Sequence, residues 1–437
     1  MRTTSIFKKL LDVNGLVVVN VEFKDPLWGE PYLLITVRVA KWRQGRCGKC
    51  GRRFKHYDVI HEARQWRSLD MGATKVILEM AETERGYCSH CDGIIVAAVP
   101  WARHNSRFTK AFEDQTAWLA TRASRSVVSQ LQRISWNTVG PVTQRVYDEL
   151  KAKAPDPLDG LTRIGIDETS YKKGHKYITV VVNHEDGSLL WAAQGFGKEV
   201  LEPFFQLLGP ERCAKIQCVT ADGARWITEC VKKYCPNAER CIDPFHVVSW
   251  ATDALDKVRR GLWREALGSK PKQSGKKRGR PQNSDPPKEK KVGEDLQQAK
   301  YSLLKNPENL TSNQAVKLEL VRVSSPTLYR AYQLKETLRI IFRLPFEEVV
   351  NALDAWLSWA RRCRIAVFVE LYFKIKRHYD AILATIRLGV SNARIEAINN
   401  KTKVAIRMAY GFRNVDNLIA YIMLACSSVK VCLPGRA

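Results

Sequence analysis

Arg163-Ile164-Gly165-Ile166-Asp167-Glu168 is the stretch that decides the fold, because it predicts a buried strand that ends in two acids. A linker, Pro155-Asp156-Pro157, precedes it. The residues that follow predict two further strands at 176–183 and 188–194, with a turn at Glu185-Asp186-Gly187 between them. This part of the chain therefore begins with three consecutive strands.

Alternating helices and strands continue the series. The predicted elements are, in chain order, a helix (198–208), a strand (216–220), a helix ending at 234, a strand (241–242) and a helix (243–267). We expect Phe245 on the buried face of the last helix. The order βββαβαβα is that of a ribonuclease-H-like domain.

Two aspartates lie at strand ends in this scheme. Asp167 is within the first strand and Asp222 just after the fourth, so adjacent strands would bring both carboxylates to one edge. Two close carboxylates repel each other unless a divalent cation bridges them, which favours a Mg²⁺ site. A third acid would complete a two-metal arrangement for phosphodiester displacement, and Glu396 is the candidate. The predicted polar face of its helix comprises Asn392, Glu396, Asn399, Asn400 and Lys403, with Ile395 and Ile398 turned to the core.

Asp243-Pro244-Phe245-His246 is a second unusual cluster. His246 could hydrogen-bond a phosphate or orient an active-site acid. A histidine that caps a buried polar group is the alternative, and the residues alone do not separate the two.

The composition points to a polyanionic partner. The chain has 437 residues and a formal net charge of +26, an excess too large for a merely solubilising surface. Hydrophobic residues make up 45%, which excludes a mainly disordered chain. No apolar run is long enough to cross a bilayer, and residues 1–10 do not resemble a signal peptide. We therefore expect a soluble, intracellular, nucleic-acid-binding protein without a membrane partner.

Two CxxC pairs indicate a metal site. Cys47 and Cys50 form the first pair and Cys88 and Cys91 the second. Four thiolates satisfy a tetrahedral Zn²⁺ and leave no open position, so we predict one structural zinc ion. Disulfides are the alternative, which a reducing cytosol disfavours.

Helical spacing begins after Arg107 and indicates a helix-turn-helix. A second short helix at 126–133, with Val127, Val128 and Leu131 buried, precedes a third that extends towards Lys151. Pro141 suggests that the third helix starts near Thr138. A helix-turn-helix places its last helix in the major groove, whereas an ordinary three-helix bundle has the same pattern. The basic excess favours DNA binding, and the predicted contacts are Arg133, Asn137, Thr138 and Arg145.

Residues 269–293 carry nine basic and two acidic residues, and this composition predicts a disordered basic linker. It contains Lys277-Arg278-Gly279-Arg280-Pro281, which resembles an AT-hook, a motif that lays arginines into a narrow minor groove. We therefore count Lys277, Arg278 and Arg280 as candidate DNA contacts. A solvated linker that touches phosphates without specificity is the alternative.

The chain resembles the bacterial insertion-sequence DDE transposases of the "ISL-three" group over nearly its whole length. The motifs that carry the resemblance are the paired CxxC ribbon, Val99-Pro100-Trp101-Ala102, Gly165-Ile166-Asp167-Glu168, Asp243-Pro244-Phe245-His246, Leu255 to Arg260, Ser391-Asn392 with Glu396-Ala397-Ile398-Asn399, and Ala409 to Asn414. The resemblance implies a catalytic triad of Asp167, Asp222 and Glu396, and a D-x-x-H motif at Asp243 and His246.

The resemblance also implies what the protein binds. It implies terminal inverted repeats and target DNA as substrates, two catalytic Mg²⁺ ions replaceable by Mn²⁺, and a homodimer or larger assembly on DNA. We expect Lys403 and Arg407 on the Glu396 helix to contact DNA as well. The implied location is the bacterial cytoplasm, with association to the nucleoid.

The predicted fold class is multidomain α+β. Its parts are an N-terminal zinc-binding β module (1–105), a helix-turn-helix domain (106–154), the first part of a ribonuclease-H-like α/β catalytic domain (155–268), the basic linker (269–293), an all-α insertion (294–380) and the C-terminal part of the catalytic domain (381–437). Two other functions stay open: a catalytically inactive DNA-binding regulator on the same scaffold, and a ribonuclease-H-like nuclease selective for nucleic-acid structure.

Overall fold

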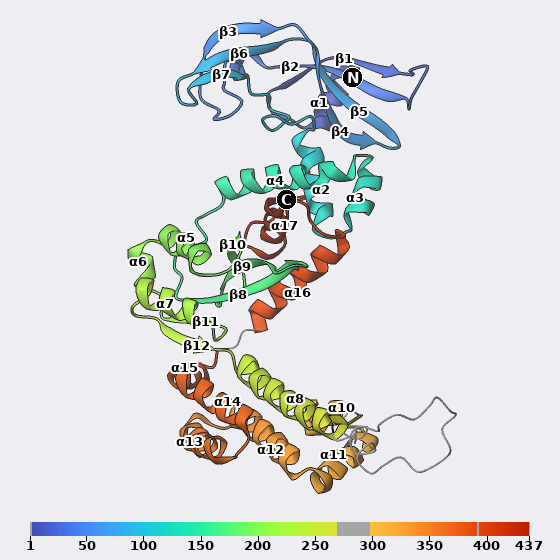
Figure 1. Ribbon diagram of the computed structural model, residues 1–437. Coiled ribbons are helices and arrows are strands. Elements are labelled where there is room, and N and C mark those ends of the chain that lie inside the picture. Colours follow the sequence, from blue (N-terminus) through green and yellow to red (C-terminus); the bar gives the residue numbers. More distant parts are fainter. Residues whose placement is uncertain (1, 269–297, 391–392, 437) are drawn as a thin grey trace, which may run out of the picture.

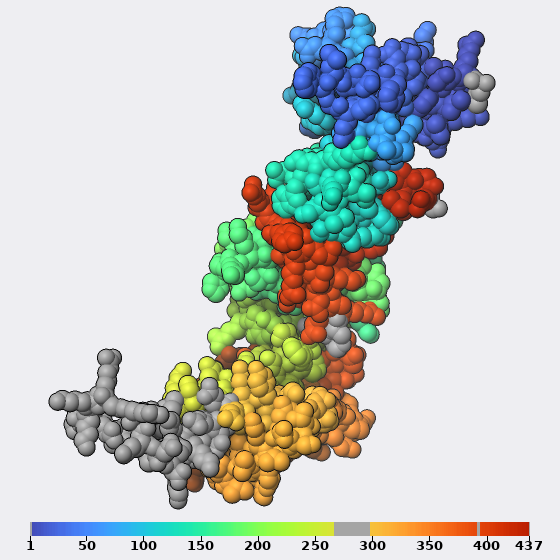
Figure 2. Space-filling view, turned by 90° about the vertical axis from the view of Figure 1, so that its right-hand side faces the viewer, coloured from blue at the N-terminus to red at the C-terminus, as the bar shows by residue number. Residues whose placement is uncertain are grey.

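The computed structural model describes residues 2–268, 298–390 and 393–436. Figure 1 shows three tiers along an elongated molecule, with the N-terminal sheets at one end and a helical region at the other. The helix-turn-helix and a five-stranded sheet lie between them. The side view in Figure 2 shows the same elongation.

The N-terminal tier contains two small sheets. One has the order β1-β2-β5-β4 and the other β3-β6-β7. The elements are α1 (Thr3–Leu11), β1 (Leu16–Lys24), β2 (Tyr32–Val39), β3 (Lys55–Ile60), β4 (Arg64–Met71), β5 (Thr74–Met80), β6 (Thr83–Cys88) and β7 (Gly93–Val96). Trp66 and Trp101 meet edge to face in the core, with ring centroids 5.4 Å apart.

Three helices follow, as predicted. They are α2 (Lys110–Ala120), α3 (Arg125–Gln132) and α4 (Trp136–Lys153). Each begins at a hydroxyl side chain that accepts a hydrogen bond from the first turn: Thr109, Ser124 and Ser135.

Two details of the helix prediction are wrong. Val127 and Leu131 are exposed and only Val128 is buried, because α3 packs through a narrow stripe. Pro141 lies inside α4 rather than near its first turn, since the helix begins at Trp136 under the Ser135 cap.

The central sheet has the order β10-β9-β8-β11-β12. Its strands are β8 (Arg163–Lys172), β9 (Lys176–Asn183), β10 (Leu189–Gln194), β11 (Cys218–Ala221) and β12 (Glu239–Ile242). The first three are antiparallel, whereas β11 pairs in parallel with both β8 and β12. The predicted succession βββαβαβα is confirmed, apart from the extra short helix α6 (Pro210–Cys213).

Helices cover both faces of this sheet. The helices α5 (Lys198–Leu208) and α7 (Arg225–Tyr234) pack on the face that carries Ile166 and Val181. On the other face, α16 (Ala393–Met408) and α17 (Val415–Cys426) pack on Val180 and Val182. The alternation of side chains along β9 therefore supplies two cores.

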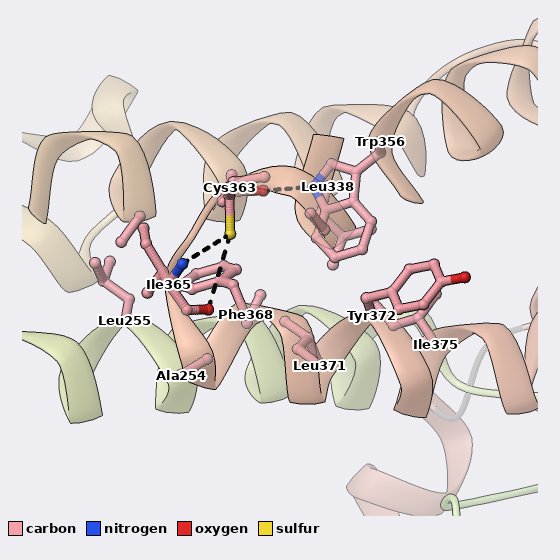
Figure 3. Close-up of a cluster of buried hydrophobic side chains, with 14 of the residues drawn as sticks. Ala254, Leu255, Leu338, Trp356, Cys363, Ile365, Phe368, Leu371, Tyr372 and Ile375 are labelled. Carbon is pink, nitrogen blue, oxygen red and sulfur yellow. Dashed lines mark hydrogen bonds between the residues drawn. The ribbon is translucent and has the colours of Figure 1, made fainter. Parts of the chain in front are cut away.

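The helical region begins with α8 (Pro244–Gly268), which leaves the sheet after β12. Its other helices are α10 (Lys300–Leu304), α11 (Ser312–Ser324), α12 (Pro326–Ile341), α13 (Phe346–Arg362), α14 (Ala366–Arg377) and α15 (Tyr379–Leu388). Trp356, Phe368 and Tyr372 are buried in its core (Figure 3). Phe245 is 64% exposed, contrary to the prediction, because it lies in the first turn of α8. No helix among the described residues is both long and apolar enough to span a membrane.

Beneath α16, the buried His184 side chain predicts a pH-dependent stability. Its Nε2 atom lies 2.5 Å from Thr220 Oγ1, and burial, with Arg394 and Arg163 nearby, lowers the pKa of His184 to about 4. The unfolded chain therefore takes up a proton between about pH 6.5 and pH 4 that the folded chain does not. The free energy of unfolding should fall by about 1–2 kcal/mol from this residue as the pH drops from 7 to 5. Urea titrations of the wild type and His184→Gln at both pH values would measure it.

The free energy of unfolding of His184→Gln should fall less between pH 7 and pH 5 than that of the wild type. This holds even if the loss of the Thr220 hydrogen bond makes the variant less stable at pH 7. His175→Asn, at an exposed turn, is the matched control and should keep the wild-type pH dependence. An equal pH dependence in His184→Gln and wild type would contradict the assignment.

Candidate functional site

Asp167, on β8, lies level with Asp222, which directly follows the neighbouring parallel strand β11. The register pairs Thr220 with Gly165, so two residues further along each strand lead to Asp222 and Asp167. The backbone N–H of Ala224 donates to Asp222 Oδ1 at 3.0 Å and holds the turn after β11. The two aspartates therefore lie close together, as predicted, but only Asp222 follows the end of its strand. Asp167 lies in the middle of β8, because the pairing with β9 continues to Lys172.

Asp167 is hydrogen-bonded through both oxygens. Its Oδ1 accepts from the backbone N–H of Glu168 at 2.8 Å, and its Oδ2 accepts from Asn399 Nδ2 at 2.6 Å. Burial, as the largest effect, raises the pKa of Asp167, and the Asp222 charge adds to the rise. The hydrogen bonds and His246 act in the opposite direction. This carboxylate therefore lies in a site that disfavours its own charge unless a cation is bound.

Glu168 is an acid of this site to which the sequence assigned no role. Its Oε1 is buried without a hydrogen-bond partner, and burial together with Asp222 and Asp167 raises its pKa to about 7. The signal was present, because Glu168 directly follows Asp167 in the sequence.

Helix α16 lies against β8 because Gly165 has no side chain. A Cβ atom at Gly165 would come within 2.2 Å of Ile395 Cδ1. Ile395 and Ile398 are buried, as predicted, and Asn399 faces Asp167. Glu396 is exposed one turn before Asn399 and makes no hydrogen bond or ion pair with other described residues. Asn392 lies outside the described residues.

The D-x-x-H cluster lies beside the same strand ends. Asp243 is buried after β12, and its Oδ1 accepts from the Phe245 backbone N–H at 3.1 Å. His246 is half-buried and close enough to lower the pKa of Asp167. Arg240, on β12, donates to the backbone oxygens of Ala221 and Asp222 and so fixes the end of β11.

The four cysteines gather at the edge of the β3-β6-β7 sheet. Their sulfur atoms all lie within 4.8 Å of one another, and all four thiols are free. The Cys47–Cys91 and Cys50–Cys88 sulfur separations are 3.8 and 3.6 Å, too long for disulfide bonds. The Cys91 backbone N–H lowers the pKa of Cys88 to about 7. Within the described ranges, this is the one group of three or more His, Cys, Asp or Glu side chains whose ligand atoms lie close enough together to hold a metal ion.

Two predicted DNA contacts are engaged inside the protein. Arg145 pairs with the buried Glu113 of α2, at 2.6 Å. Arg133, in the turn before α4, donates to the Ala73 carbonyl at 2.6 Å and pairs with Asp70 at 3.1 Å. Either arginine would have to share or give up these partners to bind a phosphate.

The other predicted DNA contacts are differently placed. Asn137, Lys403 and Arg407 are exposed, and Thr138 is half-buried. Lys277, Arg278 and Arg280 lie outside the described residues, with the rest of the basic linker.

Comparison with known proteins gives two family matches along the chain. Residues 164–422 match the family model for the ISL3 DDE transposases, described as transposase. Residues 97–146 match the model described as the helix-turn-helix domain of transposase family ISL3.

Full-length relatives agree with the domain matches. The chain is 46% identical over 439 residues to the transposase for insertion sequence element IS1557 from Mycobacterium tuberculosis H37Rv, covering 100% of this chain and 98% of the relative. It is 26% identical over 398 residues to the transposase for insertion sequence element IS1001 from Bordetella parapertussis, covering 90% and 89%. The chain therefore belongs to the ISL3 family of insertion-sequence transposases, with a helix-turn-helix domain and a DDE transposase domain.

Proposed function

We propose that this protein cuts the ends of its own insertion sequence and joins them to target DNA, using Asp167, Asp222 and Glu396 as its catalytic acids. The observation that carries the proposal is the level placement of Asp167, on β8, and Asp222, directly after the parallel strand β11. The order of the central sheet supports a ribonuclease-H-like assignment for the catalytic domain.

The donor set fits a divalent cation. Asp167, Asp222 and Glu168 offer only oxygen atoms, which Mg²⁺ prefers, and one oxygen of Glu168 is buried without a partner. Asp167 and Asp222 would hold the two Mg²⁺ ions, and Glu396 would complete the set. Bound Mg²⁺ supplies Lewis-acid activation of the attacking water or 3′-OH and stabilises the leaving oxygen.

The protein's own residues position this site. Asn399 orients Asp167 through the 2.6 Å hydrogen bond, and it couples the position of α16 to that of β8. Glu396 precedes it on the same helix, so a shift of α16 would move the third acid relative to the first two. His246, which is close enough to lower the pKa of Asp167, would hydrogen-bond a DNA phosphate beside it.

In this proposal, the N-terminal part of the chain recognises the DNA. The exposed Asn137 on α4 would meet bases or phosphates of the terminal repeat, while Lys403 and Arg407 on α16 would contact the backbone near the site. A structural Zn²⁺ on the four cysteines would hold the β3-β6-β7 sheet. The Arg278-Gly279-Arg280 segment would add minor-groove contacts.

Because two element ends must be joined together, we propose that the protein acts on DNA as a dimer or larger assembly. A bacterial cytoplasm and its nucleoid would be the place of action.

Replacing Asp167 by Asn tests the proposed chemistry. With Mg²⁺ and a labelled duplex carrying the element end, the wild type should nick at the element boundary and leave a 3′-OH. Asp167→Asn should lose at least about a hundredfold in rate, since an amide is a poor cation ligand. Gel electrophoresis of the labelled strand measures both rates.

Asp159→Asn, which removes an exposed partner of Arg212, is the matched control and should cut normally. Tight binding without cutting at any metal concentration would favour a DNA-binding regulator on this scaffold. Cutting that does not require the end sequence would favour a structure-selective nuclease.

The cysteine set predicts about one zinc per chain in protein purified under reducing conditions. Cys88→Ser should lower the zinc content to well below half of that and increase proteolysis of the N-terminal part, since three thiolates hold the ion less well. Elemental analysis and limited proteolysis provide the two readouts. Cys432→Ser, at an exposed cysteine, should leave both unchanged. Wild-type protein with well under one zinc would exclude the assignment.

A further inference from the structure

Two aromatic rings and a lysine from the helical region form a cluster beside Asp222 and Gly223. Lys374 on α14 places its Nζ 3.7 Å from the centroid of the Trp250 ring on α8. The ring of His378, between α14 and α15, lies 5.7 Å from that of Trp250. We call Trp250, Lys374 and His378 the flanking cluster.

Trp250 joins this cluster to the end of β11. A Cβ atom at Gly223, the residue after Asp222, would come within 2.7 Å of Trp250 Cζ2 and 3.5 Å of His378 Nε2. The indole edge therefore lies directly on the backbone that carries the second catalytic acid.

Lys374 is near Asp222 but is not neutralised by it. The Asp222 and Asp253 charges favour the ammonium form, while burial, the larger effect, lowers the pKa of Lys374. Among the described residues its ammonium forms no ion pair within 4 Å, and it lies over the Trp250 ring. The indole stabilises the half-buried ammonium by a cation–π interaction, and the N–H groups of Lys374 stay available for an anionic ligand.

The basic residues around the cluster favour an anionic ligand. Arg240 fixes the Asp222 carbonyl, and Arg377 and Arg225 act on His378 from nearby. These positive charges disfavour a metal ion on this side of Asp222 and favour an anion. In a protein that processes DNA, a backbone phosphate supplies that anion.

We propose that Lys374, held in place by Trp250, is a substrate-binding residue for a DNA phosphate next to the one that is cut. This inference rests on the proposed function, and it gives the helical region a direct part in substrate binding. The ammonium would form a charge-assisted hydrogen bond to the phosphate while its stem stays on the indole.

The test measures cleavage and binding in parallel, using full-length protein, Mg²⁺ and the element-end duplex. Lys374→Met keeps a stem of similar length on Trp250 and removes the charge. It should slow single-turnover nicking about 10- to 100-fold and change end binding by less than about threefold, because the N-terminal domains supply most contacts. Lys374→Arg should recover part of the rate. Lys376→Met, an exposed lysine on the same helix, should behave as wild type.

A second readout separates phosphate binding from a packing role. Single neutral methylphosphonates are placed at each phosphate flanking the cut. At one position, the methylphosphonate should slow nicking by the wild type about as much as the Lys374→Met substitution does. The same methylphosphonate should slow nicking by the Lys374→Met variant less than about twofold further. A merely structural lysine would give additive effects at every position.

The outcomes are distinct. If the wild type cuts and Lys374→Met cuts equally fast, or if every methylphosphonate effect is additive, the inference is wrong while the proposed function stands. If the wild type cuts under no metal condition, the proposed function fails and the inference fails with it.

Discussion

The parallel pairing of β8 with β11 is the constraint on which the site depends. The two strands run in the same direction, and the register that aligns Thr220 with Gly165 brings Asp222 level with Asp167. The pairing also leaves one face of β8 free for α16, where Gly165 admits the Ile395 side chain. A bulkier residue at 165 would push α16 away, and with it Asn399, which is hydrogen-bonded to Asp167. Two acids, a glycine and an asparagine thus depend on one strand pair.

Most of the central fold could be predicted from the sequence, because strand ends and helix periods are local signals. The strand at 176–183 and the helix at 198–208 were predicted to the residue. The rotation of α16 about its axis was harder to predict, because the pattern of a polar helix face does not show which of its side chains points towards the sheet. Glu396 was singled out on that face, yet Asn399 is the residue that touches Asp167, because the Ile395–Gly165 contact sets the rotation.

Basic side chains were the least predictable part of the site. The net charge of +26 correctly indicates a DNA-processing family, but it does not say which arginines are free. Glu113 is fully buried and is neutralised by Arg103 and Arg145, which lie on either side of it in sequence. Buried carboxylates require such partners. Arg145 therefore serves the packing of α2 on α4, a role that only the three-dimensional contacts reveal.

The helical region is attached to the sheet at its edge strand, β12, and this explains how it reaches Asp222. The chain leaves β12 through α8, and α15 returns beside it, where Thr385 Oγ1 exchanges two 2.9 Å hydrogen bonds with the Ile242 backbone. Arg387 also pairs with Glu239 at the other end of this strand. Since entry and exit are both fixed to β12, next to β11, the first turns of α8 and the last turn of α14 must lie near the end of β11. Trp250 then contacts residue 223, and only a glycine leaves room for it. An apparently separate helical block thereby imposes a residue requirement on the turn that follows the second acid.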